Sequence, residues 1–512
     1  MDSPSYKSVE DSLEWIRNNV ISGEGIAVSS KIRKIYPEVT GYLIPTLITW
    51  GERDLAKQFA DHLVETQNPS GSYCDPHGEF EMIFDTGQVM RGLNSAIETW
   101  GDASYIAAAE RIVKWVLTFL RSDGNFAEFP DLNQWQGDAP NGILLYAIQP
   151  IFEYLEKTGQ YAQKDVFIPT VNRLIDEIDE TGKGVLSHFN AYIIEALLDL
   201  GYEEKSRRMM THVDRRMDGD GFHPGRSEFS WICTPGQFQY SLISLKLGDI
   251  DKGLRDLNTA AKLQNRSGGW FGSYEIGIKQ FYHRWFSNRN AIIGRAVPYF
   301  SNSEVPWANK YFLDAVSLYL KIEFENQHSN FPYSIDGSDG RLKLLRTLIS
   351  ETKPKRILDA GCGKGRYLRG IEDLDGEKFG FDISEKILGY VQNNFITKVG
   401  SLTNIPFEDE SFDFIYAVES IEHCVSLRGA IGEIKRVLSN SGTLLVIDKL
   451  NLGPLNLLTR KPDWEQWFSN HQFITGMENF GFTKIKIYSN IEYEGMVNQI
   501  RFNGWVFRKS LV

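Results

Sequence analysis

The sequence predicts two halves of different fold class: an all-α half built of helical hairpins, then an α/β half with a mainly parallel sheet. Up to about Phe324, amphipathic stretches are interrupted at fairly even intervals by short turns containing glycine and an aromatic residue. After residue 340, short apolar or β-branched runs alternate with helical stretches, which is typical of a parallel sheet covered on both faces. A polar run without periodicity at residues 325–340 is expected to be the linker.

Length and composition exclude several classes of protein. The 512 residues suffice for two or three domains with sizeable cores. There are 55 Lys and Arg against 67 Asp and Glu, so the net charge of −12 gives no general attraction to nucleic acid. Hydrophobic residues at 42% and charged residues at 24% argue against long disordered regions.

The N-terminal segment and the cysteines favour a cytoplasmic protein. Residues 1–15 show neither a basic nor an apolar region of the kind found in signal peptides, and no apolar run in the sequence is long enough to span a membrane. The cysteines form neither a CxxC pair nor a dense disulfide pattern, and we expect reduced thiols. They are Cys74, Cys233, Cys362 and Cys424.

The turns of the first half resemble one another. The clearest are QNPSGSY at residues 67–73, RSDGNF at 121–126, MDGDGF at 217–222 and QNRSGGW at 264–270. A helical hairpin that ends in such a turn buries little surface alone, so neighbouring hairpins must stack to share a core.

The turn at residues 264–270 fits the pattern QxxxGxW, and the turn at 67–73 is a variant with tyrosine. On these turns residues 1–324 resemble the α/α toroids of terpenoid cyclases, protein prenyltransferases and six-hairpin glycosidases, lyases and epimerases. The resemblance implies inner and outer helices, with the turns in a structural role. The sequence has no DxDD or DDxxD cluster, which argues against a terpene cyclase.

Two carboxylates are catalytic candidates in this half. Glu38 lies in YPEVTGY and Asp85 in FDTGQ. In the six-hairpin enzymes, paired carboxylates at the inner helix ends do general acid and base work. The alternative is structural, with Asp85 capping a helix. Aromatic residues are candidates for a sugar-stacking floor or for core: Trp135, Trp231, Trp270, Tyr282 and Trp285, with His283 and Arg284 beside them.

The second half contains a glycine-rich turn after an apolar run, ILDAGCGKGRY at residues 357–367. Glycines let the backbone turn tightly and approach a ligand. The next predicted strand ends in FGFDIS, which places Asp382 about one βαβ unit later, where a carboxylate can accept both ribose hydroxyls. A nicotinamide-binding domain is the alternative, but GCGKG does not fit its GxGxxG pattern.

The order DxGxGxG, strand-Asp, NIPFEDESFDFIYAVESIEH and GTLLVIDK resembles the class I S-adenosylmethionine-dependent methyltransferases, over residues 341–512. The resemblance implies a Rossmann-like domain with seven strands and S-adenosyl-L-methionine as cofactor. It implies that the methionine part of the cofactor lies on Asp359, Gly361, Gly363 and Gly365, and that Asp382 and Ile383 contact the ribose and adenine. The Ser401 hydroxyl or the Leu402 backbone amide would recognise the adenine, and Glu419 would lie near the cofactor.

The segment AVESIEHC resembles the divalent-metal motif of small-RNA 2′-O-methyltransferases and of O-methyltransferases of ubiquinone synthesis. The resemblance implies that Glu419, Glu422, His423 and His471 hold Mg²⁺ or Mn²⁺. In the alternative no metal is bound: Glu419 lies under the cofactor, Glu422 caps a helix and His423 packs.

The sequence therefore predicts an O-methyltransferase whose acceptor is a carbohydrate or glycolipid of surface polysaccharide synthesis, held with help of the toroid. His423 or His471 would be the catalytic base, or would bind the metal that replaces it. Two alternatives for the toroid stay open. It is itself a glycan hydrolase, lyase or epimerase, using Asp85 and Glu38, or it is a scaffold without catalysis.

Overall fold

The computed structural model describes residues 6–126, 139–226, 231–275, 299–451, 465–492 and 501–510. The chain divides into two compact units, which we call unit 1 (residues 1–47 and 53–319) and unit 2 (residues 48–52 and 320–512). The division at residue 320 falls inside helix α13 (Pro306–Asn326). The stretch expected to be a linker runs from the last turn of α13 to the start of α14 (Gly340–Thr352).

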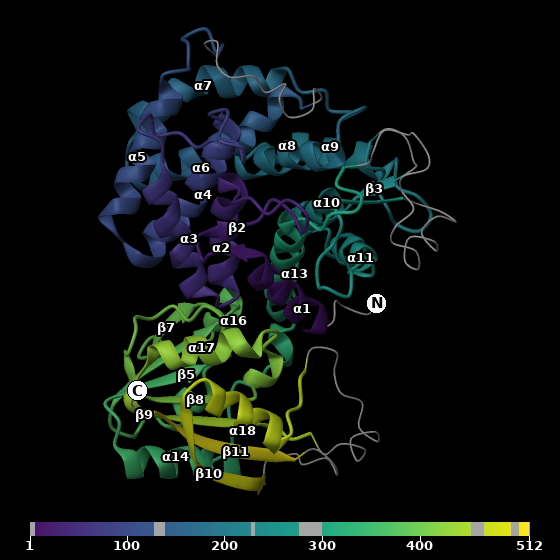
Figure 1. Cartoon of the computed structure of the whole chain (residues 1–512). Helices are drawn as coiled ribbons and strands as arrows, with labels where there is room; N and C mark the ends of the chain where they lie inside the picture. Colours follow the sequence, from purple (N-terminus) through teal and green to yellow (C-terminus); the bar gives the residue numbers. More distant parts are fainter. Residues whose placement is uncertain are drawn as a thin grey trace. The chain divides into compact units, whose positions relative to one another are not determined.

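The described part of unit 1 is mainly helical (Figure 1). Its helices before α13 are α1 (Tyr6–Asn19), α2 (Pro37–Thr49), α3 (Arg53–Thr66), α4 (Ile83–Trp100), α5 (Ala103–Leu117), α6 (Leu144–Lys157), α7 (Tyr161–Asp176), α8 (Ser187–Asp199), α9 (Glu203–Asp214), α10 (Thr234–Lys246) and α11 (Ile250–Ala261). Two small antiparallel ribbons accompany them, β1 (Val20–Ile21) with β2 (Gly25–Ile26), and β3 (Trp231–Cys233) with β4 (Ser273–Glu275).

Helices of two kinds alternate along unit 1. In α8 and α10 nearly every side chain is buried, whereas α9 and α11 bury one stripe and expose the opposite face. A helix that is apolar on one side only covers a core, and a helix buried all round lies inside it. Consecutive helices of the two kinds therefore pack as pairs, α8 with α9 and α10 with α11.

Two of the repeated turns, at residues 67–73 and 264–270, bind neighbouring helices through their first residue. Gln67 Nε2 donates to Gly71 O and to Ala108 O of α5, each at 3.0 Å. Gln264 Nε2 repeats this bond on Gly268 O at 3.0 Å and on Ser8 O of α1 at 2.9 Å. Gly268 has φ +93°, and a Cβ there would lie 1.9 Å from a backbone oxygen of α1, so the close approach requires glycine.

In unit 2, seven strands form one mixed sheet in the order β10-β11-β9-β8-β5-β6-β7. They are β5 (Arg356–Ala360), β6 (Glu377–Asp382), β7 (Ile396–Val399), β8 (Phe412–Val418), β9 (Leu438–Lys449), β10 (Phe482–Ile491) and β11 (Phe502–Lys509). Strands β5 to β9 pair in parallel, and β11 lies antiparallel between β9 and β10. The expected α/β half with seven strands is confirmed.

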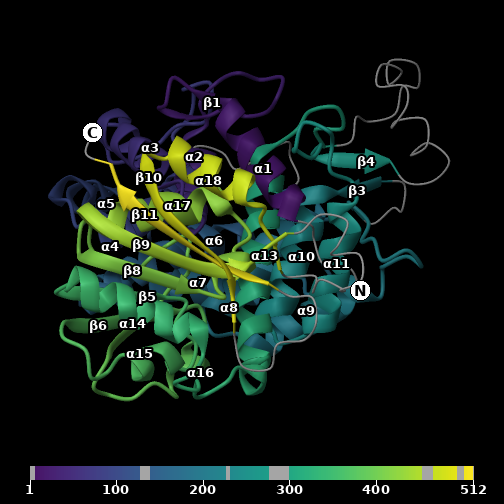
Figure 2. The same ribbon diagram turned by 90° about the horizontal axis from the view of Figure 1, so that it is seen from below.

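Helices cover both faces of this sheet (Figure 2). Side chains of α17 (Leu427–Val437) and α18 (Asn470–Asn479) join one core cluster, and those of α14 and α15 (Arg366–Gly370) join another on the opposite face. The strand order changes direction at β5, between β6 and β8. In open α/β sheets ligands bind at the carboxyl ends of the strands beside such a switch point.

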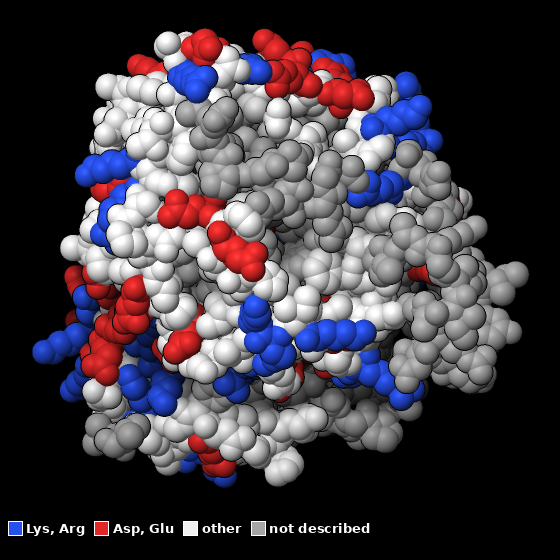
Figure 3. Space-filling view, turned by 45° about the horizontal axis from the view of Figure 1, so that its top comes forward, with Lys and Arg blue, Asp and Glu red and all other residues white. Residues whose placement is uncertain are grey.

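The surface charges, the helix lengths and the cysteines can be compared with what the composition predicted. On the face drawn in Figure 3, acidic and basic side chains are interspersed. Within the described ranges no helix is both long and apolar enough to cross a membrane. All four cysteines carry free thiols, and all but Cys74 are buried.

Candidate active site

The glycine-rich turn follows β5 at the switch point. Gly361 and Gly363 have φ of +79° and +53°, and the amides of Gly361 and Cys362 donate to Phe381 O of β6 at 3.1 and 2.9 Å. A Cβ on Gly361 would lie 2.7 Å from the Cβ of Ser420, after β8, whereas a Cβ on Gly363 would meet nothing within 4 Å. Gly361 therefore serves close packing, and Gly363 borders open space.

Asp382 ends β6 and binds this turn. Its Oδ2 accepts from Gly363 N at 3.0 Å and its Oδ1 from Ser384 N at 3.1 Å. Burial raises the pKa of Asp382, while these backbone amides oppose the shift. The carboxylate expected to hold the ribose therefore lies directly beside the glycine turn.

Asp359 is the last but one residue of β5 and is 2% exposed. Among the described residues its Oδ2 has no hydrogen-bond partner. Burial raises its pKa to about 8, against the opposing effect of Tyr416. Since a carboxylate accepts several hydrogen bonds, Asp359 can accept from a ligand, such as the amino group of a methionine moiety, besides the Tyr416 hydroxyl.

The residues expected around the adenine lie at the ends of β6 and β7. The amide of Gly400 donates to Asp382 O at 3.0 Å, which places the next residue, Ser401, beside the end of β6. Ser401 Oγ lies 3.0 Å from Thr403 Oγ1, and Ile383 is half-buried. Leu402 packs partly against the core. The structure thus gathers the expected cofactor residues at one edge of the sheet.

Comparison with known proteins decides the class of this region. Residues 358–446 match the family model described as a methyltransferase domain. These residues form a methyltransferase domain. They contain the glycine turn, Asp382 and the segment after β8.

The relatives of the domain methylate different atoms. Over 103 residues the chain is 36% identical to sterol 24-C-methyltransferase erg6 of Schizosaccharomyces pombe, covering 18% of this chain and 27% of that protein. Over 116 residues it is 28% identical to O-methyltransferase cnsE of Penicillium expansum, covering 21% and 42%. The chain thus spans less than half of either relative. The crystal structure of the YcgJ protein from Bacillus subtilis is similar over 33% of this chain and 98% of that chain, with 19% identity and a TM-score of 0.29.

Two arginines hold Glu419, the first residue after β8 in the methyltransferase domain. Arg341 Nη1 donates to Glu419 Oε1 at 2.7 Å, and Arg366 Nη2 donates to Glu419 Oε2. Burial alone would raise the pKa of Glu419, but Arg366 and Arg341 lower it. Glu419 is therefore an ionised carboxylate whose two oxygens are both satisfied by cations of the protein.

The ammonium group of Lys449 lies between the carboxylates of Glu422 and Glu465. Its Nζ lies 2.8 Å from Glu422 Oε1 and 2.7 Å from Glu465 Oε1. Glu422 is fully buried, and its Oε2 also accepts from Lys449 N at 3.1 Å. Burial raises the pKa of Glu422 to about 7, against the effect of Lys449.

The structure does not bring the four expected metal ligands together. Within the described ranges, ligand atoms of Glu422, His423 and Glu465 lie within 4.8 Å of one another, without Glu419 or His471. His471 is exposed in the first turn of α18. Lys449 already binds both Glu422 and Glu465, and the four-residue metal site expected from the sequence is not supported.

Arg341, Arg366, Lys449 and Glu465 were not expected from the sequence. Lys449 is the last residue of GTLLVIDK, and carboxyl ends of neighbouring parallel strands meet at one edge. That placement could have indicated an ion pair with Glu422. Glu465 comes from a distant segment, WEQW, that carries no recognisable motif.

Unit 1 also gathers candidate residues. Glu38, in the first turn of α2, and Asp85, in the first turn of α4, are 3% and 0% exposed. Burial raises the pKa of Asp85, and Glu38 raises it further, so the two carboxyls lie within electrostatic reach. Asp85 does not cap α4, since the cap position is Met82 and has no side-chain hydrogen bond.

The expected sugar-stacking floor is not supported where it can be checked. Trp270 is fully buried against Phe238 and Phe312, and is therefore core. Trp231 is half-buried in β3. The other aromatic candidates, Trp135, Tyr282 and Trp285 with His283 and Arg284, lie outside the described residues.

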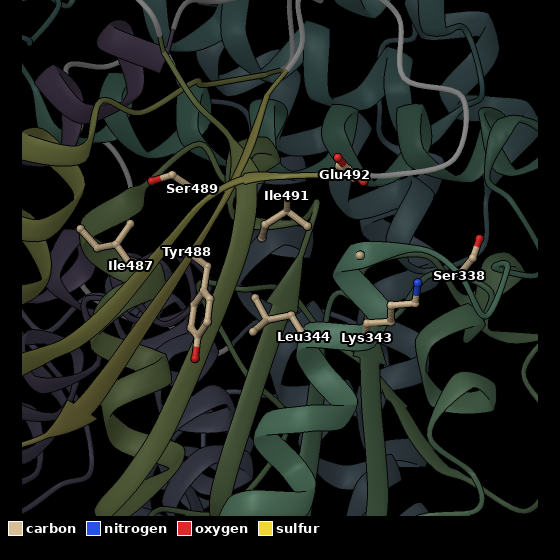
Figure 4. Close-up of a pocket in the computed structure, with 9 residues that line it drawn as sticks. Ser338, Lys343, Leu344, Ile487, Tyr488, Ser489, Ile491 and Glu492 are labelled. Carbon is tan, nitrogen blue, oxygen red and sulfur yellow. The ribbon is translucent and has the colours of Figure 1, made fainter.

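An open pocket of about 550 Å³ lies between the start of α14 and the edge strand β10 (Figure 4). Its lining includes Lys343, Tyr488 and Glu492, and Leu344 and Ile491 point toward each other across its floor. None of the expected cofactor residues lines this pocket.

Proposed function

We propose that unit 2 is an S-adenosylmethionine-dependent methyltransferase acting on a hydroxyl oxygen. The observation that carries this proposal is the glycine turn with open space at Gly363, closed by Asp382 and lying within residues that match a methyltransferase domain. Asp359, buried at the end of β5 beside Tyr416, is the proposed acceptor for the amino group of the cofactor.

The bound cofactor supplies a methyl group activated by a sulfonium charge. The remaining work of the protein is to orient the acceptor and to remove the hydroxyl proton. Asp382 and Gly363 orient the donor side, because their hydrogen bond closes the turn around the ligand space.

His423 is proposed as the base that takes the proton. Its side chain is 24% exposed, and its Nε2 lies 3.6 Å from Glu422 Oε1. Glu422 is fixed by Lys449 and acts as a positioning residue that orients the imidazole. Phe324 packs edge-on against the ring at 5.7 Å between centroids. No metal is needed in this arrangement, and exposed His471 has no part in it.

A carbohydrate or glycolipid is proposed as the acceptor, held with help of unit 1 as an α/α toroid. The toroid is supported by ring contacts that join helices far apart in sequence. Tyr311 of α13 contacts Tyr42 of α2 at 6.4 Å and Tyr192 of α8 at 6.3 Å between centroids. Its hydroxyl also lies 3.1 Å from that of Tyr146 on α6.

The test uses the full chain with methyl-labelled S-adenosylmethionine and a panel of methyl glycosides, a glycolipid and a sterol. We expect label on a saccharide as an ether that resists alkaline hydrolysis. His423→Ala should slow the transfer by about 10²–10⁴-fold, the usual contribution of a general base. Label on the sterol, or as a base-labile ester, would contradict the proposal.

A further inference from the structure

The backbone of Glu419 has a conformation that is rare for a residue with a side chain. Glu419 directly follows β8, and its φ of +53° lies in the left-handed region. In this region the Cβ comes too close to the following carbonyl oxygen, so the conformation costs free energy and persists only where the surroundings hold it. The contacts of Glu419 must therefore hold its backbone in place.

The turn that begins at Glu419 is tied to the neighbouring strands. The amide of Glu419 donates to Ile447 O of β9 at 2.9 Å. The next residue, Ser420, donates from its Oγ to Ala360 O of β5 at 2.7 Å. The amide of His423, the proposed base, donates to Ser420 O at 3.1 Å. The position of His423 therefore depends on the conformation in which the chain leaves β8.

Two arginines from different elements bind the side chain of Glu419. Arg341 belongs to the first turn of α14, and Arg366 is the first residue of α15, directly after the glycine turn. Each arginine binds a separate oxygen of the carboxylate. The Glu419 carboxylate therefore joins α14 and the glycine turn to the turn that carries His423, and all of these residues belong to unit 2.

Asp339 fixes the orientation of Arg341. Its Oδ1 accepts from Arg341 Nε at 3.0 Å and its Oδ2 from Arg341 Nη2 at 2.7 Å, a bidentate contact that holds the plane of the guanidinium. The other terminal nitrogen, Nη1, donates to Glu419 Oε1 at 2.7 Å. Asp339 and Arg341 are both buried, and hydrogen bonds are stronger in such a medium of low dielectric constant. Charges thus alternate in sign from Asp339 through Arg341 and Glu419 to Arg366.

Another arginine of α14 forms an ion pair away from this network. Arg346 binds both carboxylate oxygens of Asp373, at 2.6 and 2.7 Å, and donates to Gly370 O at 2.7 Å. These partners lie at and after the end of α15, outside the glycine turn and the turn after β8. Arg346 therefore offers a matched control for Arg341 on the same helix.

We propose that Arg341 is a positioning residue for methyl transfer, which acts through Glu419 to hold the turn after β8, and with it His423, in place. Asp339 directs Arg341 toward Glu419. Because Arg366 follows the glycine turn, the same carboxylate also ties the turn of the base to the donor side of the site. The inference rests on the proposed function, since His423 is the base proposed there.

A double-mutant cycle on methyl transfer by the full chain tests this role, with Arg341→Met, Glu419→Gln and the double variant. Each single change breaks the same link, so we expect each to lower kcat about tenfold and the double variant to lose no more than either. The KM for S-adenosylmethionine should change little, and Arg346→Met should leave both constants unchanged. Losses that multiply in the double variant would overturn the proposal. A raised KM for S-adenosylmethionine with unchanged kcat would also overturn it, because Arg341 would then act on the cofactor.

Amide hydrogen exchange at residues 419–424 tests the same link without an acceptor. Arg341→Met and Glu419→Gln should each speed exchange at this turn, while unchanged exchange in α17 shows that the chain is folded. Glu419→Gln leaves the pair of Asp339 and Arg341 intact, so it decides the test if Arg341→Met does not fold. Equal exchange in the wild type and in Glu419→Gln overturns the inference. A wild type that methylates no acceptor would instead refute the proposed function, and the exchange result would still decide whether the network holds the turn.

Discussion

Glu419 of unit 2 and the pair Glu38 and Asp85 of unit 1 lie in opposite electrostatic surroundings. In unit 2, Glu419 is held by two arginines, which keep its pKa below the ordinary value. In unit 1, Glu38 and Asp85 raise the free energy of one another's charged forms, and no cation of the described residues pairs with Asp85. Glu419 is thus held in its ionised form by its cations, whereas Glu38 and Asp85 are held toward their protonated forms by burial.

The largest effect on stability is expected from Lys449→Met. This change leaves buried Glu422 and Glu465 without their cation, which should lower the free energy of unfolding of unit 2 by about 3 kcal/mol. Urea denaturation of the full chain measures it. Lys343→Met, at an exposed lysine of the same unit, is the control and should change stability little. Equal stability of wild type and Lys449→Met would contradict the claim that Lys449 stabilises the buried carboxylates of Glu422 and Glu465.

Two glycines of the turn distinguish packing from ligand space. Alanine at either position costs about 1–2 kcal/mol, because both have positive φ. Gly361→Ala should cost more, since its Cβ would also collide with Ser420. Gly363→Ala should instead weaken S-adenosylmethionine binding at least tenfold in calorimetry, because the added Cβ would occupy the open space in which the cofactor is proposed to bind. Unchanged cofactor affinity in Gly363→Ala would mean that the ligand lies elsewhere.

A smaller effect, of opposite sign, is expected in unit 1. Asp85→Asn removes an unpartnered acid and should stabilise the chain by about 1 kcal/mol at pH 8. Folding raises the pKa of Asp85, which faces Glu38, Asp75 and Cys74. The wild type therefore loses stability as the pH rises from about 4, the ordinary value, through the raised pKa. Thermal unfolding of both chains between pH 4 and 8 should show the difference growing with pH, and a constant difference would be inconsistent with a raised pKa.

The smallest expected effect is that of a chelator. Because Lys449 binds both Glu422 and Glu465, excess EDTA should change neither cofactor affinity nor the unfolding temperature. Methyl transfer should also continue in EDTA. Activity that disappears with the chelator and returns with Mn²⁺ would restore the metal site expected from the sequence.

The sequence pattern of unit 2 made most of the residues of its proposed S-adenosylmethionine site predictable. Glycines at positive φ after an apolar strand, and an acid one βαβ unit later, are neighbours because the strands are parallel. The cation of the ExxEH segment was not predictable in the same way. Lys449 and Glu465 reach it from other elements, and only the three-dimensional sheet shows that a lysine stands where a metal was expected.

In unit 1 the sequence indicated Glu38 and Asp85 as candidates, but not whether their carboxyl groups form hydrogen bonds. Glu38 and Asp85 stood out beside tyrosines and glycine, with helix capping as the alternative for Asp85. Whether a first-turn acid caps its helix depends on side-chain geometry, and here no cap bond forms at α4.

The central claim is that donor binding depends on Asp382 of unit 2 and not on the acid pair of unit 1. Calorimetric titration of S-adenosylmethionine into the wild type, Asp85→Asn and Asp382→Ala tests it directly. We predict equal affinity for the first two chains and a loss of about 100-fold in Asp382→Ala, since the hydrogen bonds of its carboxyl with Gly363 N and Ser384 N are removed. Equal binding by all three chains, or loss of binding in Asp85→Asn, would contradict the account.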